Sequence, residues 1–155
     1  MAEQRASMRT EPQGPQLHYD SDQLTTVCQE LGLRLVVLYG SRATGTPPPA
    51  PDSDLDLAVS GAHGSRIHFM TWYRALADVF RMYDIDLALL SQADPLFRYE
   101  IFRQGRLLYG AADDFLAYRA YAHRDFVDSA DLRRLEEVLF HKKLAFIRKA
   151  LHATP

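Results

Sequence analysis

Three aspartates are spaced so that they could bind divalent metal ions. Asp54 and Asp56 are separated by one residue at the start of a predicted strand, so the pleat directs both carboxylates to the same side. Two carboxylates held that close repel each other, and keeping both ionised normally requires a cation between them. Asp86 lies in the next predicted strand, where an unpaired charge would be costly. Because all three offer only oxygen ligands, the pattern favours Mg²⁺ or Mn²⁺.

A glycine and a serine follow the first predicted buried strand. Gly40 allows the backbone to approach a ligand closely, and the N–H groups of the turn and the hydroxyl of Ser41 can hold phosphate oxygens. Taken alone, each signal is ordinary, since an Asp-x-Asp pair most often lies in a solvated turn and a Gly-Ser pair is usually a simple turn. Together they predict a phosphate-binding turn beside metal-binding carboxylates, which indicates phosphoryl or nucleotidyl transfer.

The apolar pattern places these residues on strands that alternate with helices. A helix is expected from a cap at Asp20 or Ser21 to just before Gly32, and another over about 66–82. Asp94 and Pro95 are typical of the cap and first residue of a helix over 96–103. Helical spacing then continues over 113–151, with a bend around 128–131. The expected strands cover residues 33–39, 55–59, 85–89 and 107–109, and a long connection covers 40–53.

This order predicts an α/β or α+β fold, in which a small mixed sheet is covered by helices on one side and extended by a C-terminal helical arm. We expect a flexible N-terminal tail over residues 1–18, a core over 19–112 and the arm over 113–155, packed on the core or on a partner. The spacing of Tyr118, Tyr121 and Phe126 favours contact with the core over a partner-binding stripe.

Composition narrows the classes of function. The chain has 155 residues, of which 47% are hydrophobic and 25% charged, as in one globular domain. Its net charge of -2 lacks the basic field of proteins that grip long nucleic acids, so we expect neither a processive polymerase nor stable DNA binding. The first 18 residues lack the apolar stretch of an export signal and no later apolar run reaches about 18 residues, so we expect neither export nor membrane insertion. With one cysteine, Cys28, on an apolar helical stripe, the sequence predicts a cytoplasmic protein without a membrane partner.

The motifs resemble those of DNA polymerase β-like minimal nucleotidyltransferases. The similarity covers most of residues 20–125, and is strongest to the MNT-type antitoxins of HEPN/MNT toxin–antitoxin pairs. The residues that carry it are 36–45 (VVLYGSRATG), 52–57 (DSDLDL), 84–87 (DIDL), 94–101 (DPLFRYEI) and 105–109 (GRLLY). The connection 42–53, which contains three successive prolines, is two residues longer than is usual in that family.

The resemblance implies a polymerase β-like nucleotidyltransferase core over 19–112. It also implies that Asp54 and Asp56 bind two Mg²⁺ or Mn²⁺ ions, while Asp86 completes one metal site and helps to deprotonate the acceptor hydroxyl. Asp86 matches the third acid of the family better than Asp84, which is expected to be a surface acid. The nucleotide-binding residues implied are Gly40, Ser41 and Arg42.

The resemblance further implies an enzyme, a protein adenylyltransferase. It would transfer AMP from ATP to a tyrosine of a cognate HEPN ribonuclease toxin and so neutralise it, as a homodimer or as a hetero-oligomer with the toxin. Two alternatives remain open. The chain would then be either a non-catalytic antitoxin that neutralises by binding, or a nucleotidyltransferase that acts on a small molecule such as an aminoglycoside.

Overall fold

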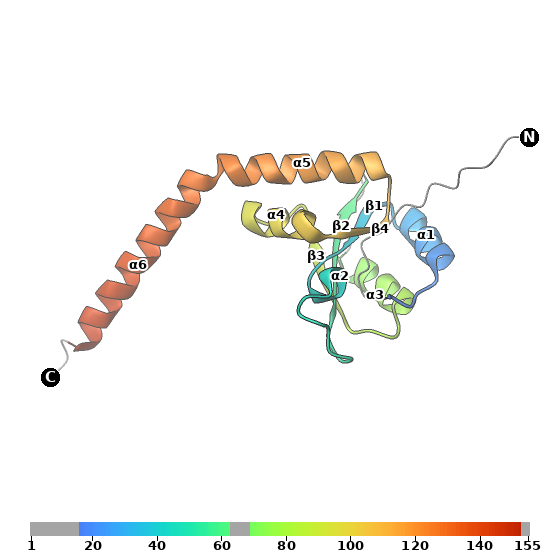
Figure 1. Cartoon of the computed structure of the whole chain (residues 1–155), viewed down its shortest axis with the longest axis horizontal. Helices are drawn as coiled ribbons and strands as arrows, with labels where there is room; N and C mark the ends of the chain where they lie inside the picture. The colour runs from blue at the N-terminus through green and yellow to red at the C-terminus, as the bar shows by residue number, and fades with distance from the viewer. Residues whose placement is uncertain (1–15, 63–68, 153–155) are drawn as a thin grey trace, which may run out of the picture.

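The computed structural model describes residues 16–62 and 69–152, which form a sheet with a helical layer on each face and a long helix leading away from it (Figure 1). The elements are α1 (Ser21–Glu30), β1 (Leu33–Leu38), α2 (Ser41–Thr44), β2 (Leu55–Gly61), α3 (Phe69–Val79), β3 (Ile85–Leu89), α4 (Pro95–Gln104), β4 (Arg106–Tyr109), α5 (Ala112–Asp128) and α6 (Ala130–His152). Most of the expected tail, residues 1–15, lies outside the described residues, as does the start of the helix expected over 66–82. The order agrees with the prediction except for α2, which was expected to be part of a connection.

The sheet has four strands in the order β3-β2-β1-β4. β1 pairs antiparallel with both β2 and β4, whereas β2 and β3 run parallel, so the predicted mixed sheet is confirmed. The central strand β1 is fully buried over its last four residues, Leu35 to Leu38. β3 and β4 form the two edges.

Helices cover both faces of the sheet, so the prediction of a single covered side was wrong. On one face, α1 and α3 bury Leu24, Cys28 and Trp72 against the strands, so the apolar helical stripe that carries Cys28 faces the core. On the other face, Ile101 of α4 and Ala122 of α5 pack against the sheet. The physical reason is visible in β1, where successive residues rather than alternate ones are apolar, and such a strand requires cover on both sides.

Two aspartates cap the helices α1 and α4, as predicted. The carboxylate of Asp20 accepts hydrogen bonds from the backbone N–H groups of Asp22 and Gln23, at 2.9 and 3.0 Å. Asp94 caps α4 by accepting from the N–H of Phe97 at 2.8 Å, with Pro95 in the first turn. Both caps satisfy N–H groups that the helix itself leaves unpaired.

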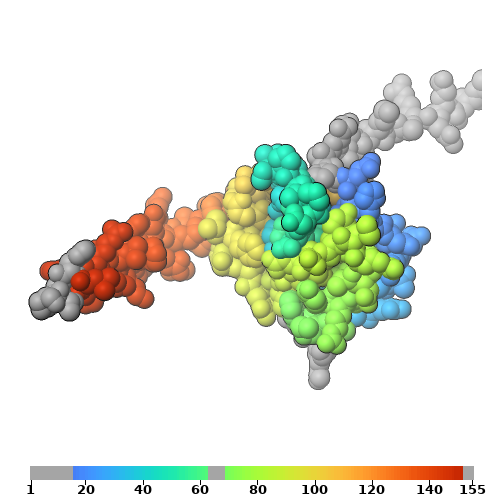
Figure 2. All heavy atoms as spheres, turned by 90° about the horizontal axis from the view of Figure 1, so that it is seen from below, coloured from blue at the N-terminus to red at the C-terminus, as the bar shows by residue number. Residues whose placement is uncertain are grey.

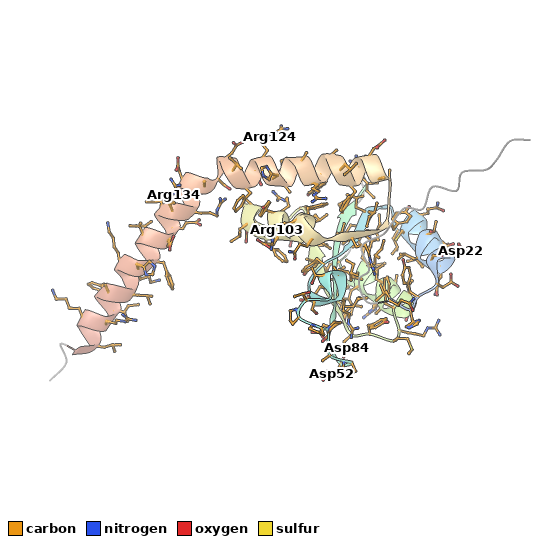
Figure 3. The ribbon with its side chains drawn as sticks, viewed as in Figure 1. Asp22, Asp52, Asp84, Arg103, Arg124 and Arg134 are labelled. Carbon is orange, nitrogen blue, oxygen red and sulfur yellow. The ribbon has the colours of Figure 1, made fainter. Side chains whose placement is uncertain are left out.

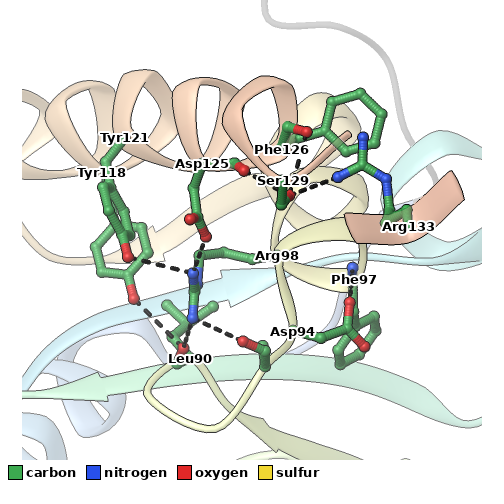
Figure 4. Close-up of polar contacts among 11 residues, drawn as sticks. Leu90, Asp94, Phe97, Arg98, Tyr118, Tyr121, Asp125, Phe126, Ser129 and Arg133 are labelled. Atoms are coloured by element: carbon green, nitrogen blue, oxygen red, sulfur yellow. Dashed lines mark hydrogen bonds and ion pairs between the residues drawn. The ribbon is translucent and has the colours of Figure 1, made fainter. Parts of the chain in front are cut away.

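A partly buried arginine, Arg98, joins α4 to α5 (Figure 4). Nη1 of Arg98 lies 2.5 Å from the carboxylate of Asp125, and its Nη2 donates to the carbonyl of Ala93 at 2.6 Å. Tyr118 stacks on Phe102 with ring centroids 4.8 Å apart. α5 is thereby fixed on the sheet through α4, and the expected contact of Tyr118 with the core is confirmed.

The C-terminal arm bends at Ser129, within the predicted range. The hydroxyl of Ser129 donates to the carbonyl of Asp125 at 2.6 Å, and it accepts from Arg133, whose guanidinium lies over the ring of Phe126. Beyond this bend α6 projects away from the rest of the molecule (Figure 2). None of the described helices has the length and apolar character needed to cross a membrane.

Candidate active site

The candidate site lies at the end of the sheet where β1 finishes and β2 and β3 begin. The backbone N–H of Tyr39, just after β1, donates to the carbonyl of Asp56 at 3.0 Å, and the N–H of Leu55 donates to the carbonyl of Asp84 at 2.7 Å. Asp52 and Asp84 lie at this same end of the molecule (Figure 3). Segments from three parts of the chain therefore meet here.

The sheet register brings two of the predicted acids side by side. Asp56 of β2 and Asp86 of β3 are direct partners in the parallel pair. Partners on neighbouring strands lie about 4.8 Å apart and project from the same face. That face is the one covered by α4 and α5, because Ala58 and Ala88, each two residues farther along, pack there. Asp54 precedes β2 and shares the side of Asp56 through the two-residue period.

The other two carboxylates act electrostatically on Asp56. Burial raises the pKa of Asp56, and the charges of Asp86 and Asp54 raise it further, whereas Arg42 lowers it. Asp56 is partly buried, and Asp54 and Asp86 are exposed. In the sheet register, Asp86 and not Asp84 is the partner of Asp56. A cluster of this kind is stabilised by a bound cation, which removes the repulsion.

The donor chemistry fits a hard divalent ion. Carboxylate oxygens are the ligands that Mg²⁺ prefers, and Arg42 is the sole cation among the described residues that lowers the pKa of Asp56. In the described ranges, however, no three or more His, Cys, Asp or Glu side chains are gathered closely enough to hold a metal ion as they stand. The fit to a metal ion therefore rests on the chemistry of the donors and not on an assembled set of three protein ligands.

Position 40 requires a glycine for two reasons, its backbone conformation and the lack of room for a side chain. Its φ of 70° lies in the left-handed region, and a Cβ at this position would overlap Oδ2 of Asp56. The carbonyl of Gly40 accepts from the N–H groups of Ala43 and Thr44, so α2 starts at Ser41 directly after the glycine. A pocket of about 260 Å³ opens beside this turn. The close approach of the turn to Asp56 joins the predicted phosphate-binding residues to the acids.

Arg42 holds the long connection in place. It is buried, and its guanidinium donates to the carbonyls of Ala50, Pro51 and Ser53, the last at 2.7 Å from Nη2. The guanidinium also lies 4.8 Å from the ring centroid of Tyr83. These contacts fix the residues that lead into Asp54. That Arg42 also binds nucleotide stays a prediction, as it does for Gly40 and Ser41.

Tyr39 belongs to the site although the sequence analysis did not single it out. Burial and the charges of Asp56 and Asp86 raise the pKa of its hydroxyl to about 12, so the phenol stays neutral. Its ring meets that of Phe97 edge to face, with centroids 5.6 Å apart. The one signal in the sequence was an aromatic residue with a polar end directly before the Gly-Ser turn.

The family is decided by a match to the sequence model of the polymerase beta nucleotidyltransferase domain, which covers residues 22–114. The chain belongs to this family. The matched range contains every element that contributes a residue to the site, from β1 to α4. The resemblance noted from the motifs is therefore confirmed at the level of the family. No curated protein matches the chain.

Solved structures share the fold of this nucleotidyltransferase. A toxin–antitoxin crystallised with AMP-PNP matches with 20% identity, covering 85% of this chain and 98% of that chain, with a TM-score of 0.53. A MntA-HpeT toxin–antitoxin variant matches with 21% identity over 86% and 99%, with a TM-score of 0.52. A third, a tri-AMPylated Shewanella oneidensis HEPN toxin in complex with MNT antitoxin, matches with 18% identity over 84% and 95%, with a TM-score of 0.48. At these identities the likeness to the first two structures shows the fold alone.

Proposed function

We propose that this nucleotidyltransferase is an antitoxin that transfers AMP from ATP to a tyrosine hydroxyl of a cognate HEPN ribonuclease toxin in the cytoplasm. The observation that carries the proposal is the pairing of Asp56 with Asp86 in the sheet register, next to the Gly40 turn. The family match over residues 22–114 supports the reaction class. The fold shared with a toxin–antitoxin chain crystallised with an ATP analogue supports the donor and the partner.

Asp54, Asp56 and Asp86 would hold two Mg²⁺ or Mn²⁺ ions. When bound, such ions supply charge neutralisation at the α-phosphate and at the departing pyrophosphate. The turn at Gly40 and Ser41 would hold the triphosphate through backbone N–H groups and a hydroxyl, with Arg42 fixing the loop behind it. These residues position the reactants, and no covalent intermediate on the protein is required.

The transfer consumes one ATP for each modified hydroxyl. The acceptor oxygen forms a bond to the α-phosphorus, the bond between that phosphorus and the α–β bridging oxygen breaks, and pyrophosphate leaves. Asp86 would accept the proton of the hydroxyl, since it lies on the exposed edge strand where an acceptor can reach it. The product is an AMP ester on the toxin.

The test combines the chain with the HEPN protein encoded beside its gene, ATP labelled at the α-phosphate, and Mg²⁺. We expect label on the toxin tyrosine and loss of ribonuclease activity. The double variant Asp54→Ala, Asp56→Ala should abolish labelling, and Asp84→Ala serves as the matched control because Asp84 is an exposed acid next to the site. If the double variant neutralises the toxin fully, the chain acts by binding and the catalytic proposal is wrong. Pyrophosphate release that depends on an aminoglycoside would instead assign it a small-molecule acceptor.

A further inference from the structure

A larger cavity, of about 720 Å³, lies along the free edge of β3. Three consecutive strand residues, Leu87, Ala88 and Leu89, form its floor, and the cap residue Asp94 lies at its rim. Its two aromatic residues are Phe69 at the start of α3 and Phe97 in α4. We refer to this cavity as the edge groove. It is separate from the pocket beside the Gly40 turn.

The floor of the edge groove presents backbone groups that face outward. The carbonyl of Asp84 and the N–H of Leu90 bond to β2, so even-numbered residues of this strand direct their backbone groups to β2 and odd-numbered residues direct theirs to the free edge. Leu87 therefore directs both its N–H and its C=O into the groove. Within residues 16–62 and 69–152, neither group has a hydrogen-bond partner. An unpaired strand edge is a template for an added strand.

The aromatic side chains that flank this edge are partly exposed. Phe69 is 38% and Phe97 37% accessible, unusually high for phenylalanine beside a core. Phe97 packs edge to face on Tyr39, whose pKa is raised by burial and then by the charges of Asp56 and Asp86. Ala88 of the groove floor lies two residues from Asp86 and on the same face of the sheet. Asp86 is thus two residues from the groove floor along β3, outside the residues that line the groove.

We propose that the edge groove binds an extended segment of the acceptor polypeptide, which pairs with Leu87 as an added strand and places a tyrosine ring against Phe97, with its hydroxyl at Asp86. This inference rests on the proposed function, since it names how the acceptor of that reaction docks. The outward-facing N–H and C=O groups of Leu87 favour a polypeptide backbone as the ligand. The phenylalanine rings select an aromatic side chain, because ring pairs of this kind contribute beyond their buried area.

The lining of the groove is poorly suited to binding a polycationic small molecule such as an aminoglycoside. Asp94 is the acidic residue of the lining, and its carboxylate is already engaged in accepting from the N–H of Phe97. Leu87, Ala88, Leu89 and the two phenylalanines provide no charge. An extended peptide with an aromatic residue matches this surface better than an aminosugar does.

The test uses two pairs of matched variants of the full chain. Phe69→Ala and Phe97→Ala remove rings from the groove. Met70→Ala and Leu96→Ala remove exposed apolar side chains at the adjacent positions, 55% and 46% accessible, which do not line it. With the HEPN protein as acceptor, we expect the KM for the toxin to rise roughly fivefold to thirtyfold in each phenylalanine variant and to stay unchanged in the controls. Affinity for AMP-PNP should be unchanged in all four variants, which shows that the donor site is intact.

A second measurement reports on strand addition itself. The amide of Leu87 should exchange with solvent quickly in the free chain and at least tenfold more slowly in the complex with the toxin, formed without ATP. Unchanged exchange at Leu87, or equal toxin KM values in the phenylalanine and control variants, would overturn the groove inference while labelling of the toxin persists. If labelling is absent but toxin affinity still depends on Phe69 and Phe97, the groove inference holds and the proposed catalytic function fails.

Discussion

At the scale of single residues, Asp56 is held where its own charge is unfavourable. Burial and the neighbouring acids raise its pKa in the folded chain. We expect Asp56→Asn to raise the melting temperature of the metal-free chain by about 1 to 3 °C at pH 7, because it removes this repulsion. The same substitution should abolish AMP transfer. Thermal denaturation in EDTA, beside the transfer assay, measures both.

The increase in melting temperature on Asp56→Asn should depend on pH, because the pKa of Asp56 is raised in the folded chain. A carboxyl whose folded pKa is raised destabilises the folded chain above that pKa, and the penalty disappears below the unfolded pKa of about 4. The difference in melting temperature between wild type and Asp56→Asn should therefore be full at pH 7 and vanish near pH 3.5, below this pKa. Asp84→Asn is the control, and it should show no gain. A less stable Asp56→Asn variant at pH 7 in EDTA would contradict this account.

Gly40 is the second residue on which the site depends. Gly40→Ala should destabilise the chain by about 1 to 3 kcal/mol through backbone strain and should also reduce transfer strongly, because the new Cβ displaces the carboxylate of Asp56. Gly45→Ala is a matched control, since Gly45 has nearly the same φ of 69° but lies outside the acid cluster. With a ψ of 8° Gly45 is in the αL region, which alanine adopts at lower cost than the ψ of −159° at Gly40, so Gly45→Ala should lose less stability and retain transfer. Urea denaturation and the labelling assay separate the two effects, and equal transfer by both variants would refute the steric argument.

At the scale of elements, the link between α2 and the connection into β2 is made by one side chain. Arg42→Lys cannot reproduce the fork of hydrogen bonds to Ser53 and Ala50, so it should cost about 1.5 to 3 kcal/mol in urea denaturation. Because Ser53 precedes Asp54, transfer should fall as well. Arg74→Lys, a substitution of the same type in α3, is the control. Unchanged stability of Arg42→Lys would show that the loop holds its shape without the guanidinium.

At the scale of the whole molecule, α6 contributes little to the folded core. The part of it that the structure describes has no buried residue, and several of its large apolar side chains are more than half exposed: Leu132, Leu135, Leu139, Phe140, Phe146 and Leu151. Exposure of this extent is typical of an interaction surface. The bend at Ser129 sets its direction away from the sheet (Figure 1).

A chain that ends after Arg134 should therefore melt within about 2 °C of the full chain, because it keeps the contact of Arg133 with Phe126 and all the buried residues of the sheet. Circular dichroism gives the melting temperature and the lost helical signal. A control that ends after Tyr109 removes Ala122 and the Arg98–Asp125 pair and should unfold. Loss of the folded state in the longer chain would show that α6 packs on the body in solution.

Most helices and strands, and the spacing of Asp54 and Asp56, could be predicted from the sequence because they depend on residues close together in the chain. Helical spacing, the caps at Asp20 and Asp94, and the two-residue period around Asp54 and Asp56 are local patterns. The metal and nucleotide roles of the site residues stay predictions. α2 was missed because four residues are too few to show a period.

Tertiary structure alone decided which distant groups meet. The pairing of Asp56 with Asp86 depends on strand register, and the loop contacts of Arg42 depend on how the connection folds back. The raised pKa of Tyr39 depends on its burial and on charges from two other strands. Cover on both faces of the sheet was likewise settled by where α4 and α5 pack. Local periodicity reports which face of an element is apolar, but the identity of the surface that buries that face is a property of the assembled chain.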